Sequence, residues 1–507
     1  MLSPQRQPLF LGIDFGSAFT RIAHGLAESG QISRLLALDY YGVPAHPSGV
    51  AHDQNHGHWL SGRAWEAALC SDLPLQNWSD PRSDLASSAQ NNPQWQMDPV
   101  FEAVQRLFLR LSAQVLESSK GAGSGGAALC LPLEATGAFK TAIRKAVSLP
   151  QLEFLSVPEA AVLGFDIASR LDERARIIGV FDAGASGCRC TFLEVRKRQG
   201  FVTARLLASA QSEKCGGKSL DQTLFERLQF KNPELKTALA QLDTQARGAA
   251  IAEALWQMHS LRLRLESTRE ASCEAVLQRL QGQTLSLERL TVENVTEDFV
   301  LEAARVLDSA LEQAGIGADR ISTMLPIGGL TRIVSLGKML AARVPYLETS
   351  PSILATNTDL LAPARGAARY AASVSSQSAA IRFAPLQTPL FGVRIGGEID
   401  AILPVNAPHK LRRSKIYAST EAVAGGVDFE IWSGFGRSVA GATHIGDVSF
   451  AIEGQNYHLD EKPLRVTLEL LDANRLRVEI DAPGSMPSAP LREVFEQTRP
   501  QIWQKAG

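Results

Sequence analysis

Two aspartates, each at the end of an apolar run and followed by a glycine turn, have the types and spacing that phosphate and metal chemistry requires. The two segments are residues 10–18 and 179–187, and their aspartates are Asp14 and Asp182. Each apolar run predicts a buried strand, so each carboxylate emerges at the carboxyl end of its strand. The small residues that follow let backbone N–H groups approach phosphate oxygens. The two segments therefore predict a nucleotide and its Mg²⁺ clamped between two lobes.

Two Gly-Gly turns follow, within residues 215–221 and 327–333. One such turn alone is ordinary turn chemistry. Taken together and in this order, the four segments resemble the nucleotide-binding domain of the Hsp70 (DnaK-like) chaperones, within the superfamily of actin, sugar kinases and Hsp70. The resemblance covers about residues 9–484.

The resemblance implies ATP or ADP and Mg²⁺ as ligands. Asp14 and Asp182 would hold the metal through water, and with Arg82 they are the implied catalytic residues. The implied nucleotide contacts are Gly16, Ser17, Gly184, Gly216, Gly217, Arg262, Gly328, Gly329 and Arg332. Arg332 would stack on or flank the base with its planar guanidinium. The alternative is a surface arginine at a helix start.

Several positions depart from the family pattern. Val157 stands where the family has a glutamate, and this chain has a glutamate two positions later, at Glu159. Gly187 stands where the family has a threonine. A nearby acidic position falls on Arg189. The first-lobe lysine that approaches the γ-phosphate is missing, and Arg82 is the nearest cation; the alternative for it is a solvated loop arginine. Phosphoryl transfer depends on positioning and electrostatic stabilisation, so we expect at most a weak ATPase.

The helix that binds adenosine in the family also differs. Its four polar family positions fall here on His259, Arg262, Leu263 and Glu266, of which only Arg262 keeps its charge.

The elements that must position these residues fall into two classes. Residues 9–372 alternate strand and helix signals, whereas the period changes to two from residue 388, with a hairpin predicted around residues 472–474. The predicted fold is an α/β two-lobed actin-like ATPase domain followed by an all-β sandwich domain. The predicted divisions are a nucleotide-binding domain over 1–372, a linker over 373–387, a peptide-binding-like sandwich over 388–484 and a tail over 485–507.

The resemblance places an apolar peptide pocket on the sandwich. Its predicted residues are Val393, Ile395, Tyr417, Val427 and Phe429. The alternative is that alternating apolar residues simply form the inner face of the sandwich. The tail offers one short helix over 491–498, too little for the family's helical lid, so we expect an open peptide site. The linker has two large apolar residues and lacks the family's aspartate, which argues against allosteric coupling.

Composition narrows the classes of partner. The chain has 51 basic and 53 acidic residues among 507, which favours neither nucleic acid nor an anionic membrane. We expect a cytoplasmic location, because the start shows no signal-peptide pattern and no run approaches a membrane span of roughly 18 apolar residues. The six scattered cysteines suit reduced core thiols.

The leading hypothesis is a divergent, lidless Hsp70-type chaperone of the stress response. Its expected partners are extended apolar peptides, with a J-domain co-chaperone or a nucleotide exchange factor. The alternative is a pseudo-ATPase scaffold that binds one dedicated partner and uses nucleotide only structurally. Sugar kinases and actin-like filaments are disfavoured, because neither explains a C-terminal β-sandwich.

Overall fold

The computed structural model divides the chain into two compact units. Unit 1 comprises residues 1–132 and 141–385, and unit 2 comprises residues 133–140 and 386–507. The structure describes residues 9–505 except 27–38, 41–42, 72, 119–123, 134, 136, 150, 166, 168–172, 199–200, 269, 345–359, 376–381, 385–389, 404–411, 419–421, 424–425, 435–438, 440–441, 452–456, 459–462, 473–474, 483–490 and 500–501.

The first sheet of unit 1 carries Asp14. Its five strands lie in the order β10 (Leu152–Ser156), β9 (Ser124–Leu131), β1 (Leu9–Phe15), β2 (Phe19–Leu26) and β5 (His46–Pro47). The central strand β1 pairs parallel with β9 and antiparallel with β2. We call the part of unit 1 built on this sheet the first lobe.

The second sheet repeats this local arrangement around Asp182. Its order is β16 (Ile321–Ile327), β11 (Arg176–Ala183), β12 (Cys188–Arg198), β13 (Phe201–Ser212) and β17 (Arg382–Ala384). Here β11 pairs parallel with β16 and antiparallel with β12, as β1 does with β9 and β2. The part of unit 1 built on this sheet is the second lobe.

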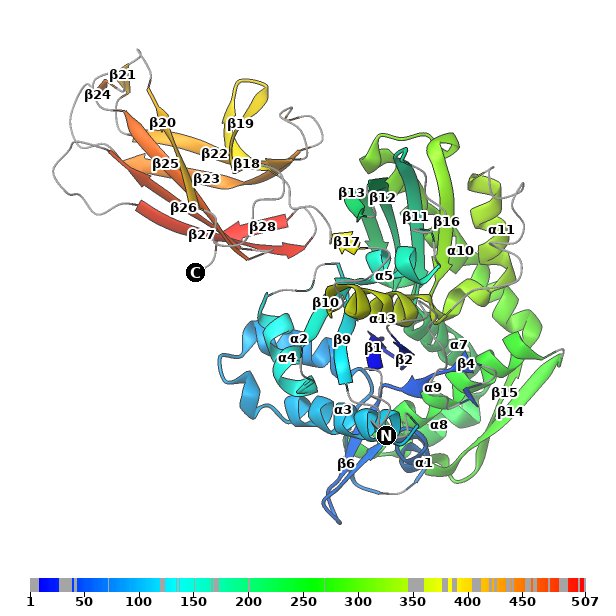
Figure 1. The fold of residues 1–507 in the computed structure, drawn as a ribbon. Coiled ribbons are helices and arrows are strands. Elements are labelled where there is room, and N and C mark those ends of the chain that lie inside the picture. Colours follow the sequence, from blue (N-terminus) through cyan, green and yellow to red (C-terminus); the bar gives the residue numbers. More distant parts are fainter. Residues whose placement is uncertain are drawn as a thin grey trace, which may run out of the picture. The chain divides into compact units, whose positions relative to one another are not determined.

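Two helices cross between the sheets (Figure 1), namely α5 (Val157–Gly164) and α13 (Ala362–Ser375). Their backbones touch. A Cβ atom added at Gly164 would lie 1.8 Å from the Ala362 carbonyl oxygen, and one added at Gly366 would lie 1.8 Å from that of Ala160. The crossing therefore requires glycine at both positions.

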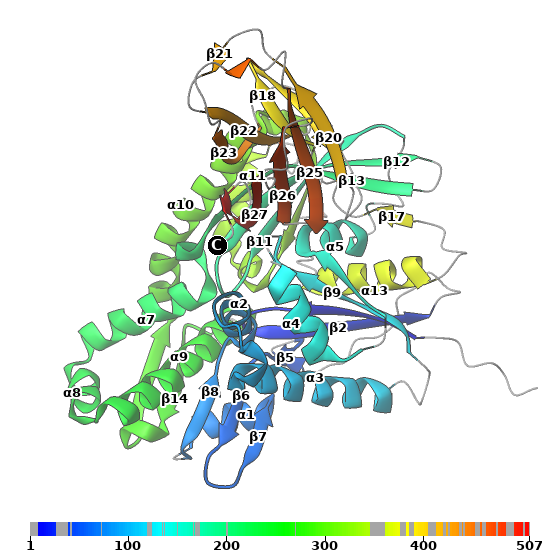
Figure 2. The same ribbon diagram turned by 90° about the vertical axis from the view of Figure 1, so that its left-hand side faces the viewer.

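The second lobe has four further helices, and Figure 2 shows α9 (Thr244–Ser267) beside the hairpin strand β14 (Ser272–Leu277). The four helices are α7 (Gly217–Lys231), α8 (Pro233–Gln241), α9 (Thr244–Ser267) and α10 (Arg289–Ala314). Thr296 lies inside α10, where its buried hydroxyl donates to the Val292 carbonyl oxygen at 2.6 Å. The hairpin β14 (Ser272–Leu277) and β15 (Gln283–Glu288) was not predicted.

The outer part of the first lobe combines a small sheet with helices. The sheet consists of β7 (His58–Ser61), β6 (Val50–Asp53) and β8 (Leu75–Trp78). The helix α3 (Pro99–Ser118) begins after Asp98, whose carboxylate accepts a hydrogen bond from the Val100 backbone N–H. The other described elements of unit 1 are β3 (Asp39–Tyr40), β4 (Val43–Pro44), α1 (Arg63–Leu69), α2 (Pro81–Asn91), η1 (Trp95–Met97), η2 (Glu213–Cys215), η3 (Gln278–Leu280), η4 (Ala318–Arg320), η5 (Gly329–Arg332) and α11 (Val334–Arg343), and α4 (Gly137–Val147) begins in unit 2.

Apart from the start of α4, the helices and strands that the structure describes in unit 2 are all strands. One sheet has the order β19 (Glu398–Leu403), β18 (Leu390–Ile395), β22 (Gly426–Gly434) and β23 (Thr443–Ala451). The other large sheet has the order β20 (Arg412–Tyr417), β25 (Leu464–Asp472), β26 (Arg475–Asp481), β27 (Leu491–Arg499) and β28 (Ile502–Lys505). A small two-stranded sheet pairs β21 (Ala422–Val423) with β24 (Tyr457–His458). Both large sheets contribute side chains to one apolar core, as two sheets packed face to face do. The predicted hairpin is confirmed, with Val466 opposite Ile480 and Leu468 opposite Val478.

The C-terminal tail corrects one prediction. The helix predicted over 491–498 is wrong, because this segment is strand β27, paired with β26, and β28 follows it. Phe495 is buried in the core at 2% exposure, so tertiary packing overrides the local helical signal. The β-rich unit therefore continues past the predicted boundary at 484.

The predicted linker is partly ordered. Its first residues, 373–375, belong to α13, and residues 382–384 form β17 against β13. Residues 376–381 and 385–387 lie outside the described residues. In the part of the chain that the structure describes, no helix is long and apolar enough to span a membrane.

Candidate functional site

Asp14 lies at the end of β1, where its carboxylate meets cations of the first lobe. Arg21, directly opposite on β2, places Nη1 3.4 Å from Asp14 Oδ2. Burial raises the pKa of Asp14 above its ordinary value, and the positive charges of Arg21 and Arg82 offset that rise only in part. The ionised form of Asp14 is therefore disfavoured at this site, and an additional cation would stabilise it.

Asp182 occupies the corresponding place at the end of β11. Burial, reinforced by the negative charge of Asp14, raises the pKa of Asp182 to about 6, although Arg189, Arg82 and Arg21 oppose the rise. The two predicted metal-binding carboxylates thus lie near enough to repel one another. Two carboxylates converging from facing strands can accept hydrogen bonds from metal-bound water.

We call the glycine turns that follow Asp14 and Asp182 the first and the second phosphate loop, after their predicted role. The first phosphate loop is fixed by residues from three segments. The Gly16 N–H donates to the Phe19 carbonyl oxygen at 3.1 Å, and the Ser48 hydroxyl donates to the Gly16 carbonyl oxygen at 2.8 Å. Arg82 donates from Nη2 to the buried Ser17 Oγ at 2.6 Å. Arg82, the nearest cation expected from the sequence, therefore lies at the first phosphate loop and helps to hold it.

The second phosphate loop is bonded to the start of α7. The Gly184 N–H donates to the Gly187 carbonyl oxygen, while the Gly217 and Lys218 N–H groups donate to the carbonyl oxygens of Gly184 and Ala185, each at 2.9 Å. The structure thereby brings Gly184, Gly216 and Gly217 together, although they come from separate segments. A Cβ added at Gly187 would lie 2.7 Å from the Ser212 carbonyl oxygen, so the threonine of the family does not fit this backbone.

The other Gly-Gly turn closes around Asp182. Gly328 has a φ of 86°, and a Cβ there would lie 2.3 Å from the Ala183 carbonyl oxygen and 2.8 Å from Asp182 Oδ1. Gly329 begins η5 and Arg332 ends it, half-buried. The glycine at 328 is therefore required for the backbone to pass this close to the carboxylate.

The predicted adenosine side is organised differently. Arg262 is only 1% exposed and donates from Nε to Asp221 Oδ1 at 2.6 Å. His259 Nδ1 lies 2.9 Å from Asp221 Oδ2. Burial alone would raise the pKa of Asp221, but the charges and hydrogen bonds of Arg262 and His259 hold it below its ordinary value. Arg262 is therefore bound within the protein rather than presented to a base.

Aromatic side chains from both lobes meet beside this ion pair. Phe19 follows the first phosphate loop, and its ring lies 5.6 Å from that of His259 and 6.4 Å from that of Trp256. Trp65 packs edge-on against Trp256 at 4.8 Å. The sequence analysis missed this cluster. The three-residue spacing of Trp256 and His259 on one helix face was the available signal.

The glutamate nearest to the missing catalytic position has another role. Glu159 is 3% exposed, and its Oε2 accepts hydrogen bonds from the Ser156 backbone N–H at 2.9 Å and from the Ser156 hydroxyl at 2.5 Å. This is a capping box at the start of α5. Glu159 is therefore held at the helix end. The side chain of Glu266 lies outside the described residues, and Leu263 is half-buried on α9.

The donor set suits Mg²⁺ better than a metal held by many side chains. Among the described residues, no group of three or more His, Cys, Asp or Glu side chains could hold a metal ion. Asp14 and Asp182 could nevertheless hold Mg²⁺, which keeps several waters and takes one or two carboxylates together with phosphate oxygens. The residues present fit that metal.

The five predicted peptide contacts divide between core and surface. Val393 and Phe429 are 3% and 5% exposed within the sandwich core, whereas Ile395 is 54% exposed. Tyr417 and Val427 are partly buried against that core, with the Tyr417 ring 5.6 Å from that of Phe429. Val393 and Phe429 therefore belong to the inner face, which was the alternative interpretation.

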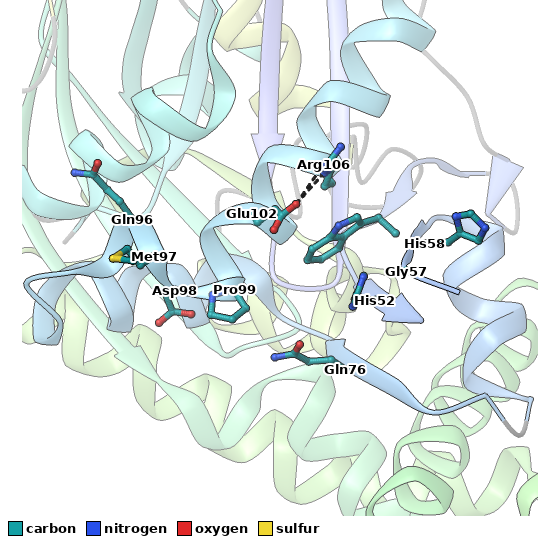
Figure 3. Close-up of a pocket in the computed structure, with 11 residues that line it drawn as sticks. His52, Gly57, His58, Gln76, Gln96, Met97, Asp98, Pro99, Glu102 and Arg106 are labelled. Carbon is teal, nitrogen blue, oxygen red and sulfur yellow. Dashed lines mark hydrogen bonds and ion pairs between the residues drawn. The ribbon is translucent and has the colours of Figure 1, made fainter. Parts of the chain in front are cut away.

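A separate concave site lies on the first lobe, between the small sheet and the start of α3 (Figure 3). It has a volume of about 880 Å³ and is lined by His52, Gly57, His58, Trp59, Gln76, Gln96, Met97, Asp98, Pro99, Glu102 and Arg106. Figure 3 shows Glu102 and Arg106 paired on α3. None of the predicted nucleotide-site residues contributes to its lining.

The Hsp70 protein family model matches residues 137–454, which is more than half of the chain. The chain belongs to the Hsp70 family. It is 23% identical over 299 residues to the chaperone protein DnaK of Thermotoga petrophila, covering 56% of this chain and 47% of that protein. The DnaK of Thermotoga neapolitana is 22% identical over 349 residues, covering 66% and 56%. The chaperone protein dnaK1 of Prochlorococcus marinus is 26% identical over 149 residues, covering 29% and 22%. This Hsp70-family chain thus spans about half the length of the curated relatives it matches.

Proposed function

We propose that this protein is a divergent Hsp70-type chaperone that binds ATP or ADP with Mg²⁺ between the two lobes of unit 1 and hydrolyses ATP slowly. The observation that carries the proposal is the pair of half-buried carboxylates, Asp14 and Asp182, at the ends of two strands with the same local pairing. Glycine turns surround them, and at Gly328 the backbone leaves no room for a side chain. Family membership supports the same ligands, because Hsp70 proteins generally bind ATP or ADP with Mg²⁺.

The residues of the first lobe would orient the phosphates. Arg82 holds Ser17, and Ser48 holds Gly16, so the loop that would face the β-phosphate is already shaped before a ligand arrives. When bound, Mg²⁺ would neutralise charge on the β- and γ-phosphate oxygens. Asp14 and Asp182 would hold its waters in place.

Slow hydrolysis follows from the groups that are missing or already engaged. Val157 has no carboxylate to orient an attacking water, and Glu159 is bound to Ser156. Gly187 has no hydroxyl to contact phosphate. Each missing group removes part of the transition-state stabilisation, and the loss of one such donor costs about 3 kcal/mol of barrier in other enzymes.

Calorimetry on the full chain tests this proposal. We expect heat of ATP and ADP binding that depends on Mg²⁺, together with single-turnover hydrolysis far slower than nucleotide dissociation. If the wild type gives no heat at millimolar ATP, the nucleotide proposal fails. Fast hydrolysis would instead refute the catalytic interpretation of Val157 and Gly187.

We further propose that unit 2 binds extended apolar peptides with rapid exchange. The exposed Ile395 supports an accessible apolar position on β18, whereas Val393 and Phe429 stabilise the core from the same unit. Backbone hydrogen bonds would supply tolerance of peptide sequence. Fluorescence anisotropy with a labelled apolar heptapeptide would measure the affinity. Ile395→Asp should abolish binding, whereas Ile416→Asp, an exposed residue of β20, is the matched control.

The scaffold alternative remains the second proposal, because Arg262 is buried in an internal ion pair and two predicted peptide contacts lie in the core. It predicts no binding to a diverse peptide panel. It also predicts that bound nucleotide raises the melting temperature without changing peptide or partner affinity.

A further inference from the structure

One ion pair connects the two lobes beside the phosphate loops. Lys218 directly follows Gly216-Gly217 at the start of α7 in the second lobe, and its Nζ lies 2.7 Å from Asp80 Oδ2. Asp80 precedes α2 in the first lobe. The contact therefore crosses between segments 138 residues apart in the sequence.

The two partners differ in how firmly they are held. Asp80 is 8% exposed and caps α2, with Oδ1 accepting from the Ser83 backbone N–H at 3.2 Å and Oδ2 from the Ser83 hydroxyl at 2.9 Å. The Lys218 side chain is 45% exposed and has a flexible four-carbon stem. The carboxylate is thus fixed in place, while the ammonium group can move.

The position of this pair relates it to the first phosphate loop. Arg82, two residues after Asp80, donates hydrogen bonds to Ser17 Oγ and to the Phe15 carbonyl oxygen. Burial would raise the pKa of Asp80, but the positive charges of Lys218 and Arg82 outweigh it and hold the pKa below its ordinary value. Arg82 is thus bonded to the loop that it supports, whereas Lys218 reaches the same region from the opposite lobe.

We propose that Lys218 is a phosphate-binding residue, which exchanges Asp80 for the terminal phosphate of a bound nucleoside triphosphate. This inference rests on the proposed nucleotide site. It gives a lysine of the second lobe the role of the first-lobe lysine that this chain lacks. Asp80 then acts as a positioning residue that holds the ammonium group near the phosphates and competes with them for it.

The two members of the pair should consequently affect nucleotide affinity in opposite directions. Lys218→Gln removes a charged donor from the terminal phosphate. Asp80→Asn keeps a residue that caps α2 but removes the competing charge. A merely structural ion pair would give both variants the same loss of stability and leave the ratio of ATP to ADP affinity unchanged.

Isothermal titration of the full chain with Mg²⁺ and either ATP or ADP separates these cases. We expect Lys218→Gln to weaken ATP binding about tenfold, as loss of one charged hydrogen bond does, and to change ADP binding much less. Asp80→Asn should bind ATP more tightly than the wild type. The matched control is Lys231→Gln, at the exposed far end of the same helix, which should behave as the wild type.

Two results overturn the inference alone: an equal change in ATP and ADP affinity for Lys218→Gln, or weaker ATP binding by Asp80→Asn. Absence of nucleotide binding by the wild type would overturn the proposed function and the inference together. Circular dichroism of each variant verifies that the fold is kept. If Lys218→Gln does not fold, Asp80→Asn still decides, because its ATP affinity rises only if Asp80 competes with the phosphate for the Lys218 ammonium group.

Discussion

On the phosphate side and the base side of the predicted nucleotide site, the pKa values of the carboxylates are shifted in opposite directions. On the phosphate side, burial and mutual repulsion raise the pKa of Asp182 to about 6. On the base side, two hydrogen-bonded partners hold the pKa of Asp221 below its ordinary value. An added cation would stabilise the ionised Asp182 carboxylate, whereas Asp221 already has a cation beside it in Arg262.

This difference supports the proposal that the phosphate side is the half that takes a metal and phosphate. A desolvated carboxylate that is repelled by a second one is stabilised by an added cation. A charge that is paired internally stabilises the fold instead. The chain thus combines a phosphate side suited to Mg²⁺ with a base side suited to holding α7 and α9 together.

The largest expected effect comes from removing the phosphate-side charge. Asp182→Asn should weaken Mg²⁺-dependent ATP binding by about a hundredfold, because a charged ligand of the metal shell is lost. Calorimetry with and without Mg²⁺ measures this, and affinity without the metal should change little. An equal loss in both conditions would show that Asp182 supports the loop rather than the metal.

The base side should respond in stability rather than in binding. Arg262→Met leaves Asp221 buried without its arginine partner, so we expect a loss of about 3 kcal/mol in the free energy of unfolding. Urea denaturation measures the change. The control is Arg305→Met. Arg305 is exposed, and its ion pair with Glu302 should contribute less than about 1 kcal/mol to the free energy of unfolding. Similar losses in the two variants would contradict the comparison.

The pH dependence follows from the raised pKa of Asp182. Below about pH 6 this carboxyl is protonated in the folded protein, so Mg²⁺-dependent binding should weaken as the pH falls through 6. In the absence of ligand, the contribution of Asp182 to the free energy of unfolding should change in the opposite direction with pH. The folded state binds this proton more tightly than the unfolded state, so its contribution is present at low pH and is lost as the pH rises through about 6. A binding profile that stays flat between pH 5 and 7 would refute the assignment.

The smallest expected effect concerns the base itself. Because Arg262 is internally bound, ATP and GTP should differ in affinity by less than about fivefold, under 1 kcal/mol. Competition titration between the two nucleotides measures the ratio. A strong preference for ATP would mean that Arg332 or another group reads the base without Arg262.

The sequence predicted the parts of the fold that depend on local pattern. Apolar runs ending in Asp14 and Asp182 indicated two equivalent strands, and alternating residues indicated the hairpin that pairs Val466 with Ile480. What it could not reveal was the choice of side-chain partners between distant segments. Arg262 bonds to a residue 41 positions away, and β27 becomes a strand because β26 offers an unpaired edge. Such outcomes depend on which surfaces the rest of the chain leaves available.

The crossing of α5 and α13 places two helix backbones in direct contact between the two lobes of unit 1. Two helices whose backbones touch at Gly164 and Gly366 have no interposed side chains to compress or repack. Any change in the angle between the two helices would have to keep this close approach, and a methyl group at either glycine would push the two backbones apart.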